Sequence, residues 1–193
     1  SYIGPGTGWG GRGNPFTIID SRFENASFVS AKISHGECRR VDFKNVSFQN
    51  TTIYAVGFSD CIFEKANFKE AKISCNFKNC NLDKASFEEA EIETRIWGCS
   101  ARKTDFRKAQ ISDIIFIETN FEGANFTGAK IIFRGINNCN FERTNFVNAI
   151  ITGFLGSFEE EISFEGANFT GAKLKGCRLY LLNFKGADFT GAD

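Results

Sequence analysis

Ala124-Asn125-Phe126-Thr127-Gly128 is the stretch that sets the fold, and near copies of it recur at 167–171 and 187–191. Each copy has a small residue first, a polar residue second, a large apolar residue third and two residues that tolerate solvent last. Residues two apart in an extended chain point to the same side. The stretch therefore predicts that each unit buries its first and third side chains together.

The large apolar position recurs along the chain at intervals of five residues. It is filled by Phe23, Phe28, Ile33, Phe43, Phe48, Ile53, Phe58, Phe63, Phe68, Ile73, Phe77, Leu82, Phe87, Ile92, Trp97, Phe106, Ile111, Phe116, Phe121, Phe126, Ile131, Ile136, Phe141, Phe146, Ile151, Phe164, Phe169, Leu174, Leu179, Phe184 and Phe189. One residue is missing after Ile73, and we place a second missing residue near Trp97–Gly98. We expect each loss to tighten a corner, with irregular backbone at 98–102.

A longer period lies above the first. Ile or Leu takes the large position in every fourth unit, at Ile33, Ile53, Ile73, Ile92, Ile111, Ile131, Ile151 and Leu174. A core residue type that returns every four units indicates a coil with four sides, stacked on its neighbours as in a solenoid. The sequence predicts an all-β, parallel β-helix of about eight coils, with strands ~4.8 Å apart along the stack.

The order of alanine, asparagine or aspartate, phenylalanine or leucine and two variable residues resembles that of the pentapeptide-repeat proteins, from Ser21 to Asp193. The resemblance implies a right-handed, quadrilateral β-helix with the small residues and the Phe, Ile and Leu residues pointing inward. It also brings a functional expectation, because some family members resemble duplex DNA in size and charge and protect DNA gyrase from inhibitors or toxins.

We expect two parts in the chain. Residues 1–16 are Gly-rich and predict an N-terminal arm or cap, in which Trp9 either plugs the open end of the coil or belongs to a disordered leader. Residues 17–193 predict one β-helix domain with a loop insertion near 154–161. Because the chain has no Met, we expect that its true start has been removed.

Charge and hydropathy narrow the function classes. Lys plus Arg and Asp plus Glu both number 23, which argues against a strongly basic nucleic-acid binder and against a strongly acidic mimic of nucleic acid. Direct nucleic-acid binding is therefore not expected. No apolar run reaches the ~20 residues of a membrane span, so no membrane association is expected either.

The seven cysteines invite a metal or redox interpretation. Cys61, Cys80, Cys99 and Cys139 fall at the small inward position of one side, Cys75 and Cys177 at other small positions, and Cys38 at a large one. A ladder on one side does not converge on a point as zinc requires, so we expect buried apolar residues and no metal. Unpaired cysteines favour a cytoplasmic or other reducing location, with a processed organellar or lumenal chain as the alternative.

A catalytic site finds little support. The only histidine, His35, lies at a corner without an obvious partner, and no phosphate loop or nucleophile motif occurs. A filled solenoid has no cleft of its own. We therefore expect no enzymatic activity and no cofactor.

The candidate interaction surface follows the Ile series in the later coils. Apolar residues take outward positions there, beside an insertion that breaks the repeat and ends in an acidic triplet. The candidate residues are Ile115, Ile117, Ile132, Phe133, Phe154, Leu155, Phe158, Glu159, Glu160, Glu161, Tyr180 and Leu181. The loop residues either cover part of this surface or contact a basic partner.

The expected function is a non-enzymatic scaffold that presents a rigid β-helix surface to a protein partner. The alternative, from the family resemblance, is a DNA-mimicking gyrase-binding protein that protects from quinolones or toxins. The repeat also runs to Asp193, so the last coil would leave an open edge. We expect weak end-to-end homodimers unless the native chain continues.

Overall fold

The computed structural model describes residues 8–9, 15–156, 162–174 and 176–193, and all regular secondary structure in this part of the chain is β-strand. The strands are β1 (Gly8–Trp9), β2 (Phe16–Ile19), β3 (Lys32–Arg39), β4 (Thr52–Ser59), β5 (Lys72–Lys78), β6 (Glu91–Ile92), β7 (Arg95–Trp97), β8 (Gln110–Ile117), β9 (Lys130–Asn137), β10 (Ile150–Gly156), β11 (Ile162–Ser163), β12 (Arg178–Tyr180) and β13 (Leu182–Asn183).

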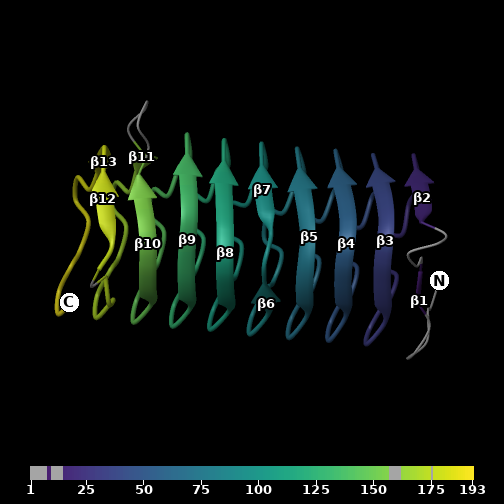
Figure 1. The fold of residues 1–193 in the computed structure, drawn as a ribbon, viewed down its shortest axis with the longest axis horizontal. Helices are drawn as coiled ribbons and strands as arrows, with labels where there is room; N and C mark the ends of the chain where they lie inside the picture. The colour runs from purple at the N-terminus through teal and green to yellow at the C-terminus, as the bar shows by residue number, and fades with distance from the viewer. Residues whose placement is uncertain (1–7, 10–14, 157–161, 175) are drawn as a thin grey trace.

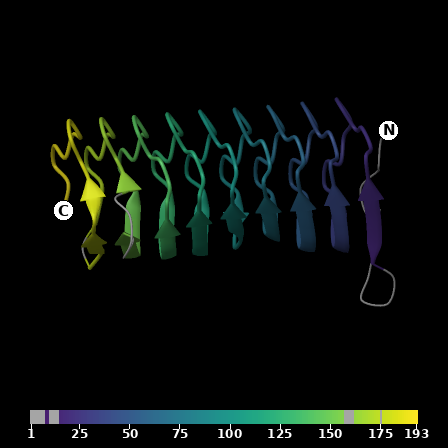
Figure 2. The same cartoon turned by 90° about the horizontal axis from the view of Figure 1, so that it is seen from above.

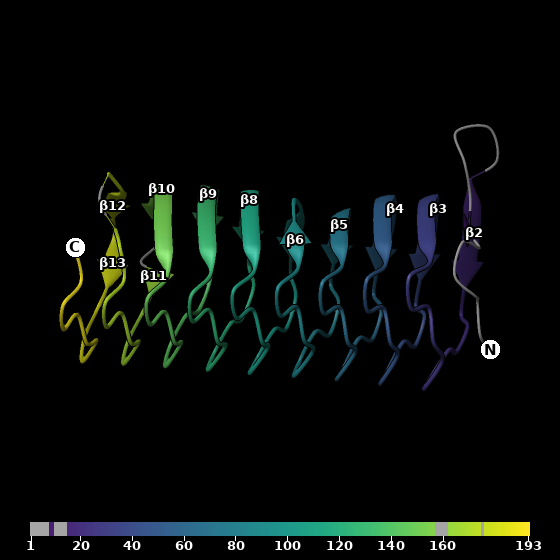
Figure 3. The ribbon, with the colours of Figure 1, turned by 90° about the horizontal axis from the view of Figure 1, so that it is seen from below.

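Eleven of these strands stack along the chain as one parallel sheet, and β11 and β13 form a second, two-stranded parallel sheet (Figure 1). Figures 2 and 3 show that the chain between successive strands returns on the far side, so that each strand belongs to one coil. Ile33 lies opposite Ile53, and Ile53 lies opposite Ile73. The predicted parallel β-solenoid of about eight turns is confirmed.

A regular coil has four sides of five residues. In the coil that contains β4 we number them side 1 (41–45), side 2 (46–50), side 3 (51–55) and side 4 (56–60), and we use the same numbers for the other coils. The strands therefore cover sides 3 and 4. Sides 1 and 2 hold only isolated parallel bridges, such as Asn125 to Asn145 on side 2.

A column of phenylalanine rings fills the coil behind side 2. Neighbouring rings stack with centroids 4.6 to 5.2 Å apart, from Phe28 through Phe48, Phe68, Phe87, Phe106, Phe126, Phe146 and Phe169 to Phe189. A second column behind side 1 is interrupted, because Leu82 and Ala101 take the large position there and both are fully buried. The ring columns form the core of the solenoid.

The last residue of a unit makes the corner. Asn45, Asn50, Ala55 and Asp60, which close the four sides of one coil, all have φ between 52° and 56°. The second residue of a unit supports the turn, since Asn125 Oδ1 accepts a hydrogen bond from the Thr127 amide at 3.0 Å. This turn explains the preference for Asn, Asp or Ser at the second position.

The structure confirms the first predicted fault and moves the second one. The second missing residue lies between Ile92 and Ile96, so Ile96 is buried and Trp97 is 45% exposed, whereas we expected Trp97 to point inward. The backbone at 98–102 follows the ordinary repeat: Gly98 is a corner with φ of 63°, and Ser100 bridges both neighbouring coils.

The two ends of the stack differ. Both β1 and β2 pair with β3, so Gly8–Trp9 covers part of the edge of β3. At the other end Leu179 lies opposite buried Leu155, yet it is exposed because no further strand stacks on β12. The expected boundary between an arm and a β-helix domain stays a prediction.

Candidate functional site

The corner between sides 3 and 4 is missing from two successive coils. His35, Ala55 and Asp113 form it in other coils, with φ of 52° to 55°. The coils of β5 and of β6 and β7 are one residue short, and their chain continues straight. The alternation of an extended chain then turns Cys75 and Thr94 inward, where both are buried.

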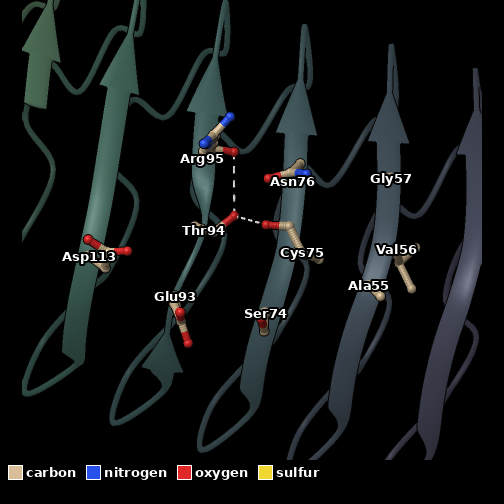
Figure 4. Close-up of a pocket in the computed structure, with 10 residues that line it drawn as sticks. All are labelled: Ala55, Val56, Gly57, Ser74, Cys75, Asn76, Glu93, Thr94, Arg95 and Asp113. Atoms are coloured by element: carbon tan, nitrogen blue, oxygen red, sulfur yellow. Dashed lines mark hydrogen bonds between the residues drawn. The ribbon is translucent and has the colours of Figure 1, made fainter. Parts of the chain in front are cut away.

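A hydrogen bond holds the two straight segments together. Thr94 Oγ1 donates to the Cys75 carbonyl oxygen (Figure 4). The loss also shifts the register between β4 and β5 at Tyr54 to Gly57. The faults are therefore built into the packing, but each removes a corner instead of tightening it as we expected.

A trough lies where the corners are missing. Two adjoining hollows of about 400 and 390 Å³ share Ser74 and Glu93, and we name them together the corner trough. Ala55 lines it from the coil before the faults and Asp113 from the coil after them (Figure 4). We did not expect a hollow here, although another of about 340 Å³ lies on regular coils, between Asp20 and Ile62.

Five charged side chains line the corner trough, and two of them, Lys72 and Glu91, form an ion pair at 3.2 Å. Glu93 and Arg95 line it from one coil, and neither side chain makes an ion pair or hydrogen bond to another described residue. Glu37 and Arg39, equally spaced on side 4 of a regular coil, form an ion pair at 2.7 Å. On the rim, Asp113 pairs with Arg134 at 3.0 Å. The sequence signal for this site is the missing residue itself.

An apolar surface adjoins the corner trough on side 4. It consists of Trp97, Ile115 and Ile117, and we name it the Trp97 surface. Trp97 lies opposite Ile117, and Arg95 lies opposite Ile115. Both isoleucines are half-buried. Trp97 Nε1 donates to Glu118 Oε2 at 3.1 Å, and Lys78 Nζ lies 5.0 Å from the Trp97 ring centroid.

The predicted interaction surface divides into separate areas. Ile132 is 53% exposed, and Ile150, which is not among the candidate residues named above, is 37% exposed on side 3 of the next coil. Ile115 and Ile117 lie on side 4, beyond the corner. Ile132 lies opposite Thr152 and Ile150 lies opposite Lys130, so the two isoleucines are diagonal neighbours on side 3, apart from Ile115 and Ile117.

Phe133 and Leu155 do not lie on the surface. Phe133 is 2% exposed, because β9 continues straight past the position of the corner and alternation turns this ring inward opposite Ile114. Leu155 is 1% exposed and stacks in register with Leu179. The expected outward position of Phe133 and covering role of Leu155 are therefore wrong.

The insertion begins later than we expected, since β10 pairs with β12 as far as Gly156. Phe158, Glu159, Glu160 and Glu161, together with the side chain of Phe154, lie outside the described residues. Tyr180 and Leu181 are both exposed, and Leu181 is a corner with φ of 49°. They lie near the last described coil.

The cysteine ladder is buried as predicted. Cys61, Cys80, Cys99 and Cys139 lie inside side 1, and Cys80 N donates to Cys99 Sγ at 3.3 Å. Burial raises the pKa of Cys139 to about 12. All seven cysteines are free, and Cys177 is half-buried. The described chain holds no group of three possible metal ligands.

Surface charges alternate along the stack. Ion pairs at the surface link Lys44 to Glu64 at 3.1 Å and Arg102 to half-buried Asp83 at 2.8 Å on side 1. Side 2 continues in the same way, with Lys69 between Glu88 and Glu70. The outward positions of sides 1 and 2 that the structure describes therefore carry mixed charge, and not a continuous acidic row.

The chain is a parallel β-solenoid of repeated five-residue units, and two family models identify its kind. The pentapeptide repeat region model matches residues 73–151, and the pentapeptide repeats (8 copies) model matches residues 162–193. Together the matches cover more than half of the chain. The chain belongs to the pentapeptide repeat family.

Solved structures of other pentapeptide repeat proteins are similar at low identity. HetL, involved in heterocyst differentiation regulation in the cyanobacterium Nostoc sp., is 15% identical, with 92% of this chain and 84% of HetL covered and a TM-score of 0.49. QnrB1, a plasmid-mediated fluoroquinolone resistance protein, is 19% identical, with 93% and 91% covered and a TM-score of 0.44. No curated protein matches the chain. The family assignment rests on the two models.

Proposed function

We propose that this protein is a non-enzymatic scaffold that holds a protein partner on sides 3 and 4 of its solenoid. The observation that carries the proposal is the pair Ile132 and Ile150, exposed on neighbouring coils. In the preceding coils the same outward rows hold Lys, Thr, Ser, Glu and Gln, together with one aromatic residue, Tyr54, which is 48% exposed. Burial of apolar area is the main gain in protein association, so this pair favours a docked partner.

The rest of side 3 and side 4 fits such a partner. The Trp97 surface lies beyond the corner, and aromatic side chains are frequent anchors of interfaces. The backbone ladder beneath is continuous from β3 to β10. A partner would therefore bind a preformed surface, and binding would cost little conformational entropy on the side of this protein.

Site-specific photo-crosslinking in cells tests the proposal. A benzophenone amino acid at Ile132 is expected to give one or a few discrete protein adducts. The same amino acid at Thr127, on polar side 2, is the matched control and should give none of them. Ile150→Lys should lower the yield at position 132 at least tenfold. Identical adducts from both positions would refute the docking surface.

The gyrase interpretation receives no support from the charges that the structure describes, because sides 1 and 2 carry ion pairs of mixed sign. A supercoiling assay with and without a quinolone tests it directly. Protection or inhibition by excess protein would replace the scaffold proposal with the gyrase alternative.

The seven free cysteines support our proposal of a reducing location such as the cytoplasm. Fractionation of cells that express the tagged native gene would test this location. The structure describes no helix that could cross a membrane.

A further inference from the structure

We infer that the corner trough is a docking groove for an extended peptide segment of the partner. The segment would present a cationic, an anionic and a large apolar side chain at alternate positions, opposite Glu93, Arg95 and Trp97. This inference rests on the proposed scaffold function and names the chemistry of the partner.

The dimensions of the corner trough fit one extended chain. Between β4 and β8 lie only the coil of β5 and the coil of β6 and β7. The trough therefore spans three strand spacings of ~4.8 Å, or about 14 Å between the bordering strands. An extended chain with its side chains needs about 10 Å, the distance between stacked sheets, and so fits within this span.

Alternation in the floor sets the pattern of the partner. Glu93, Arg95 and Trp97 are all exposed and alternate with buried Thr94 and Ile96, with Glu93 just before β7 and the other two within it. In an extended strand such alternate residues are about 6.5 Å apart. An extended partner has the same period, so its alternate residues meet these three side chains one by one.

Glu93 and Arg95 can both accept a charged partner. In a regular coil the same spacing gives an internal ion pair, as Glu37 and Arg39 show at 2.7 Å. Across the missing corner, Glu93 and Arg95 form no such pair. Both side chains are exposed, and a Lys or Arg opposite Glu93 and an Asp or Glu opposite Arg95 would supply counter-charges for them.

The third position favours an apolar residue. Trp97 lies beside half-buried Ile117 in the next strand, and its ring is 45% exposed. Its polar atom is already satisfied, because Nε1 donates to Glu118. A Phe or Leu side chain can therefore cover the ring without leaving a buried donor unpaired.

Other occupants fit less well. A nucleic acid strand would meet the carboxylates of Glu91, Glu93 and Asp113 around a single unpaired cation, Arg95. A ligand with only a carboxylate would pair with Arg95 and would offer no positive charge to Glu93. Only a segment with both signs of charge matches the floor.

Synthetic peptides test the order of charges. The probes are acetylated and amidated Ser-Lys-Ser-Glu-Ser-Phe-Ser and its reverse, Ser-Phe-Ser-Glu-Ser-Lys-Ser, because the chain direction in the trough is open. The controls exchange Lys and Glu. Titration calorimetry with the whole chain should show one probe binding at least tenfold tighter than its exchanged control.

A double charge reversal should invert that preference. The variant Glu93→Lys with Arg95→Glu is expected to bind the exchanged peptide at least tenfold tighter than the original. Equal binding of both peptides by either protein would overturn the inference, as would binding that the reversal leaves unchanged.

A rebuilt corner provides the matched structural control. Inserting Gly after Ser74 and after Glu93 restores five residues to each short side, and Gly tolerates the left-handed corner. The variant should keep its melting temperature within a few degrees and lose peptide binding at least tenfold. Retained binding would overturn the inference. If it unfolds, the charge reversal alone decides.

The two proposals fail separately. Crosslinks at Ile132 without any peptide preference would support the scaffold proposal and refute peptide docking in the corner trough. Peptide preference without crosslinks at Ile132 would support peptide docking in the corner trough and refute a docking surface at Ile132 and Ile150.

Discussion

Each corner of the solenoid depends on one residue in the left-handed conformation, and most of these residues are not glycine. Asn45, Lys65 and Glu89 all hold φ between 55° and 59°. This conformation is uncommon for residues with a Cβ. The side chains above and below compensate through ladders, such as the hydrogen bond from Asn45 Nδ2 to Asn25 Oδ1 at 3.2 Å.

Asp83 is the most strongly held carboxylate on side 1. It accepts hydrogen bonds from Ser100 Oγ at 2.6 Å, from the Arg102 amide at 2.9 Å and from the Arg102 guanidinium at 2.8 Å. Burial raises the pKa of Asp83, but these bonds outweigh burial and hold the pKa below its ordinary value. Its contribution to stability is therefore present above about pH 4 and is lost as the pH falls through the lowered pKa.

Asp83→Asn should lower the free energy of unfolding by about 1–2 kcal/mol at pH 7. The loss should shrink below about pH 3, where the wild-type carboxylate is protonated too. Urea denaturation at the two pH values measures it. Glu24→Gln is the control, because exposed Glu24 makes no ion pair or hydrogen bond within the described chain. An equal loss at both pH values would contradict the argument.

For Trp97 and Phe133, the spacing of the sequence repeat does not predict correctly whether the side chain points inward or outward. A missing residue is compatible with a tightened corner or with a lost one, and only the backbone path decides between them. Because the corner is lost, Ile96 takes the inward position that we assigned to Trp97. Phe133 also points inward because β9 has no corner at this position. Side 3 of this coil still has five residues, and the pairing of β8 with β9 takes up the extra residue as a shift in register.

At the scale of elements, the ring column behind side 2 stabilises the stack of strands. Phe106 stacks between Phe87 at 5.0 Å and Phe126 at 4.6 Å, with planes within 9°. Offset stacking adds to the gain from burial. Every coil therefore fixes the height and orientation of the next.

Phe106→Ala should cost about 3–5 kcal/mol in the free energy of unfolding, because it leaves a cavity inside a closed column. Phe189→Ala is the matched control: its ring stacks on one side only and is exposed, so the cost should be clearly smaller. Guanidinium denaturation of both variants measures the difference. Equal costs would show that the column is not continuous in solution.

The strands themselves followed from the sequence, because the period of five fixes which residues point inward. The corner trough did not, because it arises from what two coils lack. The insertion was located only approximately: the period shows that residues are added between Ile151 and Phe164, but not that Leu155 remains in the core.

At the scale of the whole molecule, the last described coil leaves core side chains at the end of the stack. Leu179 and Phe189 are exposed there. We keep the proposal that two copies of this chain associate weakly end to end, burying these residues.

Sedimentation equilibrium measures that association. We expect a dissociation constant in the range of ~0.1–1 mM, which corresponds to a weak interface of about 4–5.5 kcal/mol. Phe189→Lys should abolish it by placing a charge in the contact, whereas Thr170→Lys on side 2 should not. A monomer at every concentration would rule out the end-to-end contact.

The missing corners have one more consequence, for folding. A solenoid of near-identical coils can misalign, because shifting one part of the chain by a whole coil preserves most inward and outward positions. The two short coils make such a slip costly. A shifted partner would set a cornered strand against Cys75 or Thr94, losing the hydrogen bond between them. The two short coils therefore fix the register of the whole stack, because only the correct alignment places them next to each other.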